Sequence, residues 1–289
     1  MSFDDLPPLP PSLHPEAVGY ANRCMAATRR VQADHRVLID CRYGDDYWQK
    51  LDVYLPRTAG VAALPVLVFF HGGAWTSGTK EWMGFMAPPL LDLPAIFVAA
   101  NYRLAPTVRY PEIVEDCLAA TAWVHENIAR HGGDPGRLLV GGHSAGGHLA
   151  ALVALDRPRR RKARIADSAI RGCLAVSGSF DIRNREAPAG TMERRIYDVL
   201  LSRDSDDAAA SPITHVGRDS VPFFVAWGER DFPRLIKQAS AFSAALAAAG
   251  VRVETLEIPS ADHFEANEVS GMPDANWTRI ARRWLSESC

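Results

Sequence analysis

Residues 137–155 read RLLVGGHSAGGHLAALVAL, and this stretch decides the fold. It opens on consecutive apolar residues, which is typical of a strand covered on both faces, and it closes on small and apolar residues that suit a helix. Between the two, residues 142–146 read GHSAG and match the pattern GxSxG. A sharp strand-to-helix turn of this kind holds its serine in a strained conformation with the hydroxyl exposed. We therefore predict that Ser144 is a nucleophile.

Two glycines, Gly142 and Gly146, flank the serine. A side chain at either position is expected to collide with neighbouring backbone, because the strand and the helix pass close to each other around the turn. The alternative is an ordinary tight turn with an incidental serine. The other motifs of the chain weigh against that alternative.

Short apolar runs recur along the chain with helix-length segments between them. The runs occupy residues 65–73, 95–103, 137–144, 172–178, 222–229 and 253–260. This alternation predicts an α/β fold with a mostly parallel central sheet and helices on both faces. Residues 35–44 and 48–56 alternate apolar and polar side chains around the turn signal YGDD, which predicts an N-terminal antiparallel hairpin.

The chain is expected to divide into two parts. Residues 1–35 form a Pro-rich leader and a helix that packs on the domain, and residues 36–289 form a single α/β domain. The longest stretch without a clear strand is 179–220, which we name the insertion. Ligands bind beyond the carboxyl ends of parallel strands, so the insertion is either a lid or substrate wall, or a longer surface crossover.

The motif HGGAW occupies residues 71–75, directly after an apolar run. Two glycines after a strand allow the backbone to turn its N–H groups toward a ligand, where they can stabilise an oxyanion. By geometry the N–H of Ala145, the residue after the serine, joins them. His71 is expected to brace this loop. Trp75 is predicted to line the substrate pocket, with packing of the loop as its alternative role.

A nucleophilic serine needs a base, and the base needs a residue that orients it. His263 follows the last strand-like run, and Asp231 follows the one before it. We predict these two residues as base and orienting acid, with Asp181 as the alternative acid. His143 and His148 are expected to point away from the hydroxyl. His125 and His131 are expected on or near a surface helix, and Asp206 and Asp207 at the surface or at the start of a helix.

Composition excludes several classes of function. A formal net charge of −2 without a basic stripe predicts no nucleic-acid partner. The basic run 157–164 is expected to be a surface loop, with binding of phosphates or anionic lipid as the alternative. The N-terminus does not resemble a secretory signal, and no run reaches the roughly 18 apolar residues of a membrane span. We therefore expect no membrane partner and a cytoplasmic location. A homodimer is compatible with the sequence, which does not decide the oligomeric state.

The five cysteines are odd in number and lack CxxC spacing, which predicts reduced thiols and neither a disulfide framework nor a zinc site. They are Cys24, Cys41, Cys117, Cys173 and Cys289. The chain has no HExxH, and no GxGxxG follows a strand. No metal and no cofactor are therefore expected.

From about residue 36 onward, the chain resembles the α/β-hydrolase superfamily, and within it the esterases, lipases and arylformamidases that carry an HGGxW motif. The segments GGAWTSGTK, FMAPPL and DHFE are similar to kynurenine formamidases. NYRLAP and SAGGH resemble bacterial hormone-sensitive-lipase-like and feruloyl-esterase-like enzymes. The order Ser144, Asp231, His263 is also that of the superfamily.

The resemblance implies that Ser144 is the nucleophile, that His263 acts as general base and then acid, and that Asp231 orients it. It also implies an oxyanion hole made by the N–H groups of Gly73, Ala74 and Ala145, with Gly72 as a substitute because the donors shift by one residue between subgroups. Kynurenine formamidases commonly have a tyrosine where this chain has Ala74. This departure counts against strict formyl specificity.

The predicted function is that of a serine hydrolase that cleaves a small acyl group from an ester or an aryl amide through an acyl-enzyme. Strict kynurenine formamidase activity is the specific alternative. An alternative of a different class is a non-catalytic binding protein with the same fold. Such proteins usually lack a residue of the catalytic set, whereas here all three positions are filled.

Overall fold

A computed structural model describes residues 6–11, 14–57 and 63–287. At its centre is an eight-stranded sheet in the order β1-β2-β4-β3-β5-β6-β7-β8. The strands are β1 (Arg36–Arg42), β2 (Lys50–Leu55), β3 (Leu64–Phe70), β4 (Ile96–Ala100), β5 (Gly133–His143), β6 (Ile170–Val176), β7 (Phe223–Gly228) and β8 (Val253–Ile258). β1 pairs antiparallel with β2, β2 pairs antiparallel with β4, and the remaining pairs are parallel. The predicted α/β fold and N-terminal hairpin are confirmed.

Strand β3 has no polar face, and its side chains supply two cores. Val66, Val68 and Phe70 belong to one hydrophobic cluster, whereas Leu67 and Phe69 belong to the other. All five side chains are 0% exposed, because successive residues of a strand point to opposite faces and helices cover both. The run of consecutive apolar residues therefore indicates a strand whose two faces are both covered by helices.

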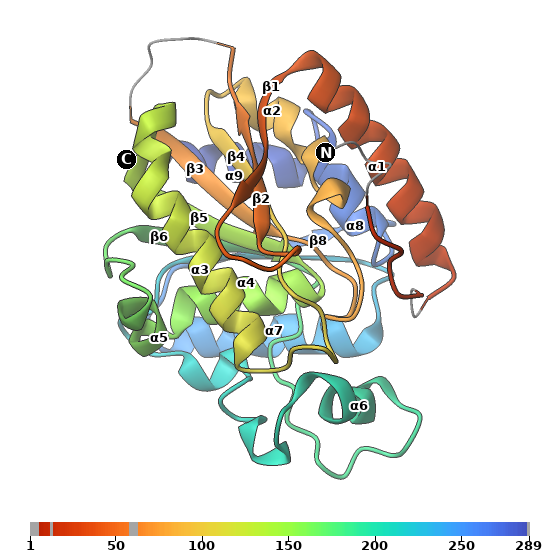
Figure 1. Cartoon of the computed structure of the whole chain (residues 1–289). Coiled ribbons are helices and arrows are strands. Elements are labelled where there is room, and N and C mark those ends of the chain that lie inside the picture. Colours follow the sequence, from red (N-terminus) through yellow and green to blue (C-terminus); the bar gives the residue numbers. More distant parts are fainter. Residues whose placement is uncertain (1–5, 12–13, 58–62, 288–289) are drawn as a thin grey trace.

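The helices divide between the two faces of the sheet (Figure 1). One face carries α3 (Glu112–Asn127), α4 (Ala145–Leu155), α5 (Arg157–Lys162) and α7 (Pro233–Ala248). The other carries α1 (Glu16–Asp34), α2 (Ala87–Leu91), α8 (Glu265–Glu268) and α9 (Asn276–Glu287). Helix α6 (Met192–Arg195) lies in the insertion, at the lower edge of Figure 1.

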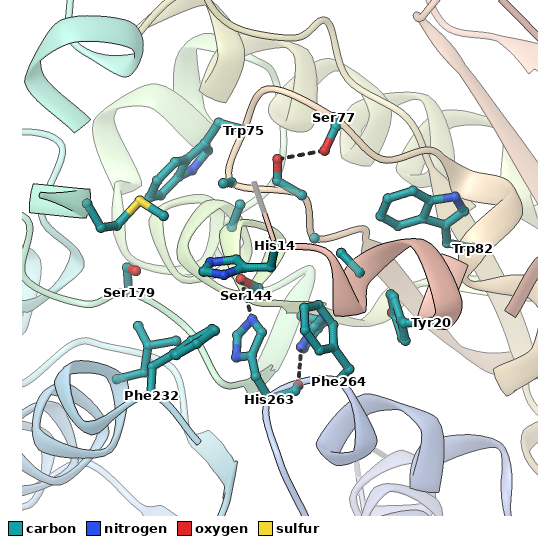
Figure 2. A pocket seen from close by; sticks show the side chains of 18 of the residues that line it. His14, Tyr20, Trp75, Ser77, Trp82, Ser144, Ser179, Phe232, His263 and Phe264 are labelled. Carbon is teal, nitrogen blue, oxygen red and sulfur yellow. Dashed lines mark hydrogen bonds between the residues drawn. The ribbon is translucent and has the colours of Figure 1, made fainter. Parts of the chain in front are cut away.

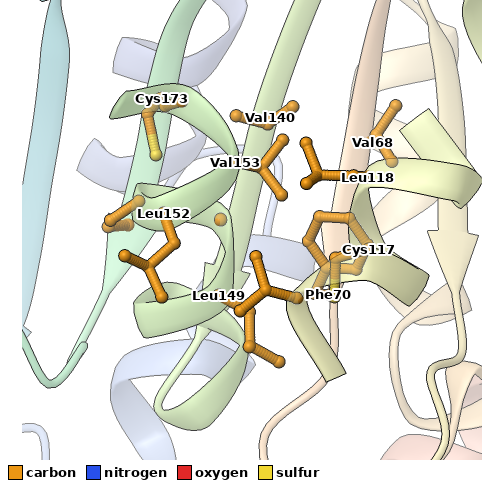
Figure 3. Close-up of a cluster of buried hydrophobic side chains, with 14 of the residues drawn as sticks. Val68, Phe70, Cys117, Leu118, Val140, Leu149, Leu152, Val153 and Cys173 are labelled. Carbon is orange, nitrogen blue, oxygen red and sulfur yellow. The ribbon is translucent and has the colours of Figure 1, made fainter. Parts of the chain in front are cut away.

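Helix α4, which starts directly after Ser144, is the most deeply packed helix of the fold, and every one of its residues is buried. Figure 3 shows Leu149, Leu152 and Val153 of this helix against side chains of β3, β5, β6 and α3. Burying one Leu or Val side chain contributes about 1.5–3 kcal/mol relative to leaving it exposed. This packing fixes the direction of the helix and hence the position of its first residues.

The strand register places the ends of β3, β5 and β6 at one edge of the sheet. Phe70 pairs with Gly142 across β3 and β5, and His143 pairs with Val176 across β5 and β6. The motif HGGAW therefore starts beside the turn that holds Ser144.

Two expectations about charged residues were wrong in part. The basic run is not a loop, although several of its side chains are exposed, and Asp206 lies in the first turn of a short helix, as one alternative held, but not at the surface. The basic run 157–164 contains helix α5, whose first turn is capped by Asp156, and the side chain of Arg160 points inward with 1% exposure. Asp206 and Asp207 are also buried rather than at the surface, and Arg185 pairs with Asp207 at 2.8 Å. In the Asp207 case an ion pair compensates for the water that the carboxylate loses on burial.

The cysteines within the described part of the chain, Cys24, Cys41, Cys117 and Cys173, are free thiols. Cys24, Cys117 and Cys173 are buried, and Cys289 lies outside the described residues. In the ranges that the structure describes, no helix combines the length and the apolar character needed to cross a membrane.

Candidate active site

Ser144 occupies a strained turn between β5 and α4. Its backbone has φ 55° and ψ −118°, a conformation that L-residues rarely adopt. The N–H of Ser144 donates to the carbonyl of Val176 at 2.8 Å, which ties the turn to β6. A Cβ atom on Gly146 would overlap the carbonyl oxygen of Phe70, and one on Gly142 would overlap that of Gly146. Glycine is therefore required on both sides of the serine.

The structure brings Ser144, His263 and Asp231 together (Figure 2). The Ser144 Oγ lies 2.9 Å from Nε2 of His263, and Nδ1 of His263 lies 2.8 Å from Oδ1 of Asp231. An ionised carboxylate only accepts hydrogen bonds, so Nδ1 carries the proton and Nε2 accepts from the serine hydroxyl. This tautomer is the one that can take a proton from Ser144.

Asp231 has more partners than the sequence analysis anticipated. The hydroxyl of Ser177 donates to Oδ2, and the N–H of Phe232 donates to Oδ1 at 2.7 Å. Burial alone raises the pKa of this carboxyl, but the hydrogen bonds and the charge of His263 outweigh burial and hold the pKa of Asp231 below its ordinary value. Ser177 is the first residue after β6 and has φ 53°, and its position directly after a predicted strand is the sequence signal that could have identified it.

The alternative acid, Asp181, lies elsewhere. Its carboxylate pairs with Arg183 at 2.7 Å, and it lines a second cavity together with Lys237 and Gln238. Because Nδ1 of His263 binds Asp231, the structure favours Asp231 for the orienting position.

The loop after β3 turns its backbone away from the sheet. Gly73 has φ 120°, Ala74 has φ 50° and Trp75 has φ 62°. The carbonyl of Gly73 accepts from the N–H groups of Thr76 and Ser77 at 3.1 and 3.0 Å. These bonds fold the loop into a tight turn that cannot continue the strand.

Three backbone N–H groups are free beside Ser144. Within the described ranges, no protein group accepts a hydrogen bond from the N–H of Gly73, Ala74 or Ala145. Ala145 is the first residue of α4, where an N–H has no partner within the helix. All three residues, and Gly72 with them, line the cavity that contains Ser144. These are the donors that the sequence analysis named for an oxyanion.

This cavity, which we name the Ser144 pocket, has a volume of about 190 Å³. Figure 2 shows Trp75, Ser179 and Phe232 on one side of Ser144, and Tyr20, Trp82 and Phe264 on the other. In the second group the ring of Tyr20 contacts both of the others, with centroids 5.9 Å from that of Trp82 and 5.3 Å from that of Phe264. The lining is mostly apolar, which suits a small apolar part of a ligand.

The N-terminal segment and the insertion were expected to influence substrate preference, but sequence reasoning did not identify which of their residues line the pocket. His14, Ala17 and Tyr20 line the Ser144 pocket, and the ring of His14 stacks on that of Phe232 at 4.8 Å. Ser179 and Met192, both in the insertion, line it as well. Pocket residues from segments this far apart have no common signal in the sequence.

The three other buried histidines hold the walls of the site. His71 stacks on Tyr102 with centroids 4.2 Å apart, and Nε2 of His143 donates to the carbonyl of His263 at 2.9 Å. His148 accepts from the indole N–H of Trp75 at 3.1 Å and donates to the carbonyl of Ala210 at 2.7 Å. Burial lowers the pKa of His71 and His148 to about 4 and, together with the charge of His263, that of His143 to about 3. These three rings are therefore neutral near pH 7.

In the ranges 6–11, 14–57 and 63–287, no group of three or more His, Cys, Asp or Glu side chains is placed to hold a metal ion. The chemistry that this arrangement can perform is nucleophilic. A hydroxyl, an imidazole and a carboxylate lie in hydrogen-bonded series, and the residues that carry the three free N–H groups line the same cavity as the hydroxyl.

Comparison with known proteins agrees with the observed fold. The profile of a family described as alpha/beta hydrolase fold matches residues 67–266. Esterase LipQ of Mycobacterium tuberculosis is 37% identical over 228 residues, which cover 75% of this chain but only 53% of LipQ, so the chain spans about half of that relative. A kynurenine formamidase of Danio rerio is 29% identical over 265 residues, which cover 91% of this chain and 87% of that protein.

Solved structures share the fold. An esterase of Pyrobaculum calidifontis superposes with a TM-score of 0.74 at 23% identity, covering 94% of this chain and 93% of the esterase.

Proposed function

The chain belongs to the alpha/beta hydrolase family, and we propose that within this family it is a serine hydrolase. It cleaves a small acyl group from an ester or an aryl amide through an acyl-enzyme. The observation that carries this proposal is the hydrogen-bonded series from Ser144 through His263 to Asp231, with links of 2.9 and 2.8 Å.

The reaction starts with attack of the Ser144 Oγ on the substrate carbonyl carbon. Nε2 of His263 takes the serine proton, and Asp231 keeps the imidazole oriented and stabilises its positive charge. The carbonyl oxygen becomes an oxyanion that accepts hydrogen bonds from the N–H groups of Gly73, Ala74 and Ala145. Loss of one such donor typically lowers the rate by about 10²–10³.

The tetrahedral intermediate then breaks the bond to the leaving group, and His263 gives its proton to the departing oxygen or nitrogen. A water molecule attacks the acyl-enzyme in the same way, with His263 as base, and the carboxylic acid leaves as Ser144 regains its proton. Every proton in this cycle passes through Nε2 of His263.

The size of the pocket limits the substrate. Its volume of about 190 Å³ lies below the range of roughly 300–1,000 Å³ that is typical of pockets for drug-sized ligands. Trp75 and Phe232 are proposed to contact the substrate on one side of Ser144, and the rings around Tyr20 on the other. A short acyl group or a single aromatic ring fits this space better than a long chain.

Kynurenine formamidase activity is a second candidate. It is favoured by the Danio rerio relative, which this chain matches over 87% of its length. Ala74 counts against strict formyl specificity, because a small residue beside the oxyanion donors leaves room for acyl groups larger than formyl.

Ser144→Ala tests the proposal. We expect kcat/KM for p-nitrophenyl acetate to fall by at least about 10⁴, because without the hydroxyl only the oxyanion donors and binding assist attack by water. Labelling of the intact protein by a fluorophosphonate probe is expected at Ser144 and absent from the variant. Ser240→Ala, on the exposed side of α7, serves as the control with unchanged labelling.

A substrate panel separates the two candidates. N-formylkynurenine and the p-nitrophenyl esters of acetate and butyrate are compared by kcat/KM. A strong preference for N-formylkynurenine would establish the formamidase, and the reverse ranking a carboxylesterase. Failure of the wild-type protein to hydrolyse any substrate or to react with the probe would instead favour a non-catalytic binding protein.

A further inference from the structure

Arg234 is the one permanently charged side chain among the described residues that line the Ser144 pocket. It lies at the start of α7, three residues after Asp231, so its position is fixed by the same loop that carries the orienting acid. The remaining lining side chains are aromatic, aliphatic, small, hydroxyl-bearing or histidine. A cation in a mostly apolar pocket needs an anionic or hydrogen-bonding group to stabilise its charge.

The partners that the chain itself supplies leave this cation incompletely paired. Nη1 of Arg234 donates to the Oγ of Ser179 at 3.2 Å, and Nε lies 3.4 Å from Oε1 of Glu193, longer than the 2.7–2.9 Å of a close ionic hydrogen bond. Nη2 has no hydrogen-bond partner among the described residues. Burial lowers the pKa of Arg234, and the guanidinium still remains protonated.

Two cavities meet at this side chain. Arg234 lines the Ser144 pocket and also a second cavity of about 300 Å³, whose other lining residues include Glu193 and Lys237. Its side chain is 23% exposed, so a ligand in the Ser144 pocket can reach it. Ser179, its hydrogen-bond partner, lines the Ser144 pocket too and adds a second donor.

A planar guanidinium presents its N–H groups as a fork that matches the two oxygens of a carboxylate. We propose that Arg234, assisted by Ser179, recognises a carboxylate on the substrate, so that the preferred substrates are acyl compounds that carry an anionic group. This inference rests on the proposed function and adds its substrate class. The carboxylate can belong to the acyl part or to the leaving group, and the test distinguishes these two sources.

Glu193 competes with the substrate carboxylate for the guanidinium of Arg234. It lies on α6 of the insertion with 33% of its side chain exposed, so it can turn away when a substrate carboxylate arrives. Glu193→Gln removes the competing charge and is therefore expected to strengthen the preference, whereas Arg234→Met removes the recognising charge and weakens it. Opposite effects from these two variants are not expected if their contact serves only to hold the insertion.

The experiment compares matched substrates that differ in one group, a carboxylate or its uncharged carboxamide. On the acyl side the pair is the p-nitrophenyl half-ester of glutaric acid and its carboxamide. On the leaving-group side the pair is N-formylanthranilate and N-formylanthranilamide. The readout is the ratio of kcat/KM, carboxylate over carboxamide, which cancels changes that affect both substrates equally.

For the wild-type protein we expect a ratio of about ten to one hundred in one of the two pairs, the usual value of a charge-assisted hydrogen bond. Arg234→Met is expected to bring that ratio to about one or below, and Arg234→Lys to give an intermediate value because an ammonium keeps the charge but not the fork. Glu193→Gln is expected to raise it several-fold. If Arg234→Met does not fold, the ratios of kcat/KM measured for Glu193→Gln and Arg234→Lys still test the inference.

Wild-type ratios of one or below in both pairs, or a ratio that Arg234→Lys and Glu193→Gln leave unchanged, would overturn the inference while hydrolysis of the carboxamides continued. Absence of hydrolysis together with absence of fluorophosphonate labelling would instead overturn the proposed function, and this inference with it. The two failures are therefore distinguishable.

Discussion

At the scale of single residues, the site depends on a strained serine and on the glycine that makes room for it. A left-handed backbone conformation at a non-glycine residue costs of order 1–3 kcal/mol, and the surrounding packing must hold it. Ser144 has φ 55°, and Gly146 lies so close to β3 that a Cβ atom would overlap the carbonyl of Phe70 and come too near that of His71. The serine can be presented because the glycine has no side chain.

We expect Gly146→Ala to abolish reaction with a fluorophosphonate probe. The added methyl meets backbone atoms of β3, which cannot move without breaking the sheet, so the turn must open and carry Ser144 away from His263. Overpacking of this kind typically costs about 1–3 kcal/mol or more in the free energy of unfolding, which urea titration measures. Gly217→Ala is the control, since nothing lies within 4 Å of a Cβ at that position. Equal labelling of the two variants would contradict this account.

At the scale of elements, helix α4 connects the loop after β3, which carries the motif HGGAW, to the insertion. The connection is made by one side chain, that of His148. An indole N–H can only donate, so Nδ1 of His148 accepts from Trp75, and Nε2 must then carry the proton that is donated to the carbonyl of Ala210. His148 is 0% exposed, so water cannot replace either partner. The neutral ring thus links two segments that form the pocket wall.

His148→Leu is expected to lower the free energy of unfolding by about 2–6 kcal/mol, because two buried polar groups lose their partners at roughly 1–3 kcal/mol each. It should also release Trp75 and change the ratio of kcat/KM between p-nitrophenyl acetate and butyrate. His215→Leu is the matched control, since His215 binds the neighbouring carbonyl of Ala209 at 2.8 Å in an exposed position. A large change in stability for His215→Leu, or none for His148→Leu, would show that burial does not decide the effect.

At the scale of the whole molecule, what could be predicted from the sequence was local. Consecutive apolar runs indicated the covered strands, and GHSAG, GERD and ADHF each lie at or just beyond the end of a strand, which is why Ser144, Asp231 and His263 could be named together and do meet. The contributions of His14 and Arg234 could not be predicted, because they depend on how α1 and α7 pack across the strand ends. The burial of Asp207 was missed because its partner Arg185 is distant in sequence.

The buried neutral histidines also make the free energy of unfolding depend on pH. His71, His143 and His148 are each 0–2% exposed, and burial lowers their pKa values from 6.5 to about 4, 3 and 4. The unfolded chain binds protons at these positions below pH 6.5 while the folded chain does not. Their contribution to stability is therefore complete above pH 6.5 and is lost as the pH falls toward 4.

We therefore expect the free energy of unfolding to fall steeply between about pH 6 and pH 4. Each histidine contributes a slope of about 1 kcal/mol per pH unit, so the three together remove on the order of 6 kcal/mol over two units, comparable with the whole stability of about 5–15 kcal/mol for a typical domain. Urea unfolding at a series of pH values measures this slope. His71→Gln is expected to reduce the slope by about a third. Thr121→Val, which removes the buried hydroxyl that donates to the Cys117 carbonyl, should shift the curve without changing its slope. An unchanged slope in His71→Gln would mean that the ring takes up its proton within the folded protein, and the neutral state assigned to it would be wrong.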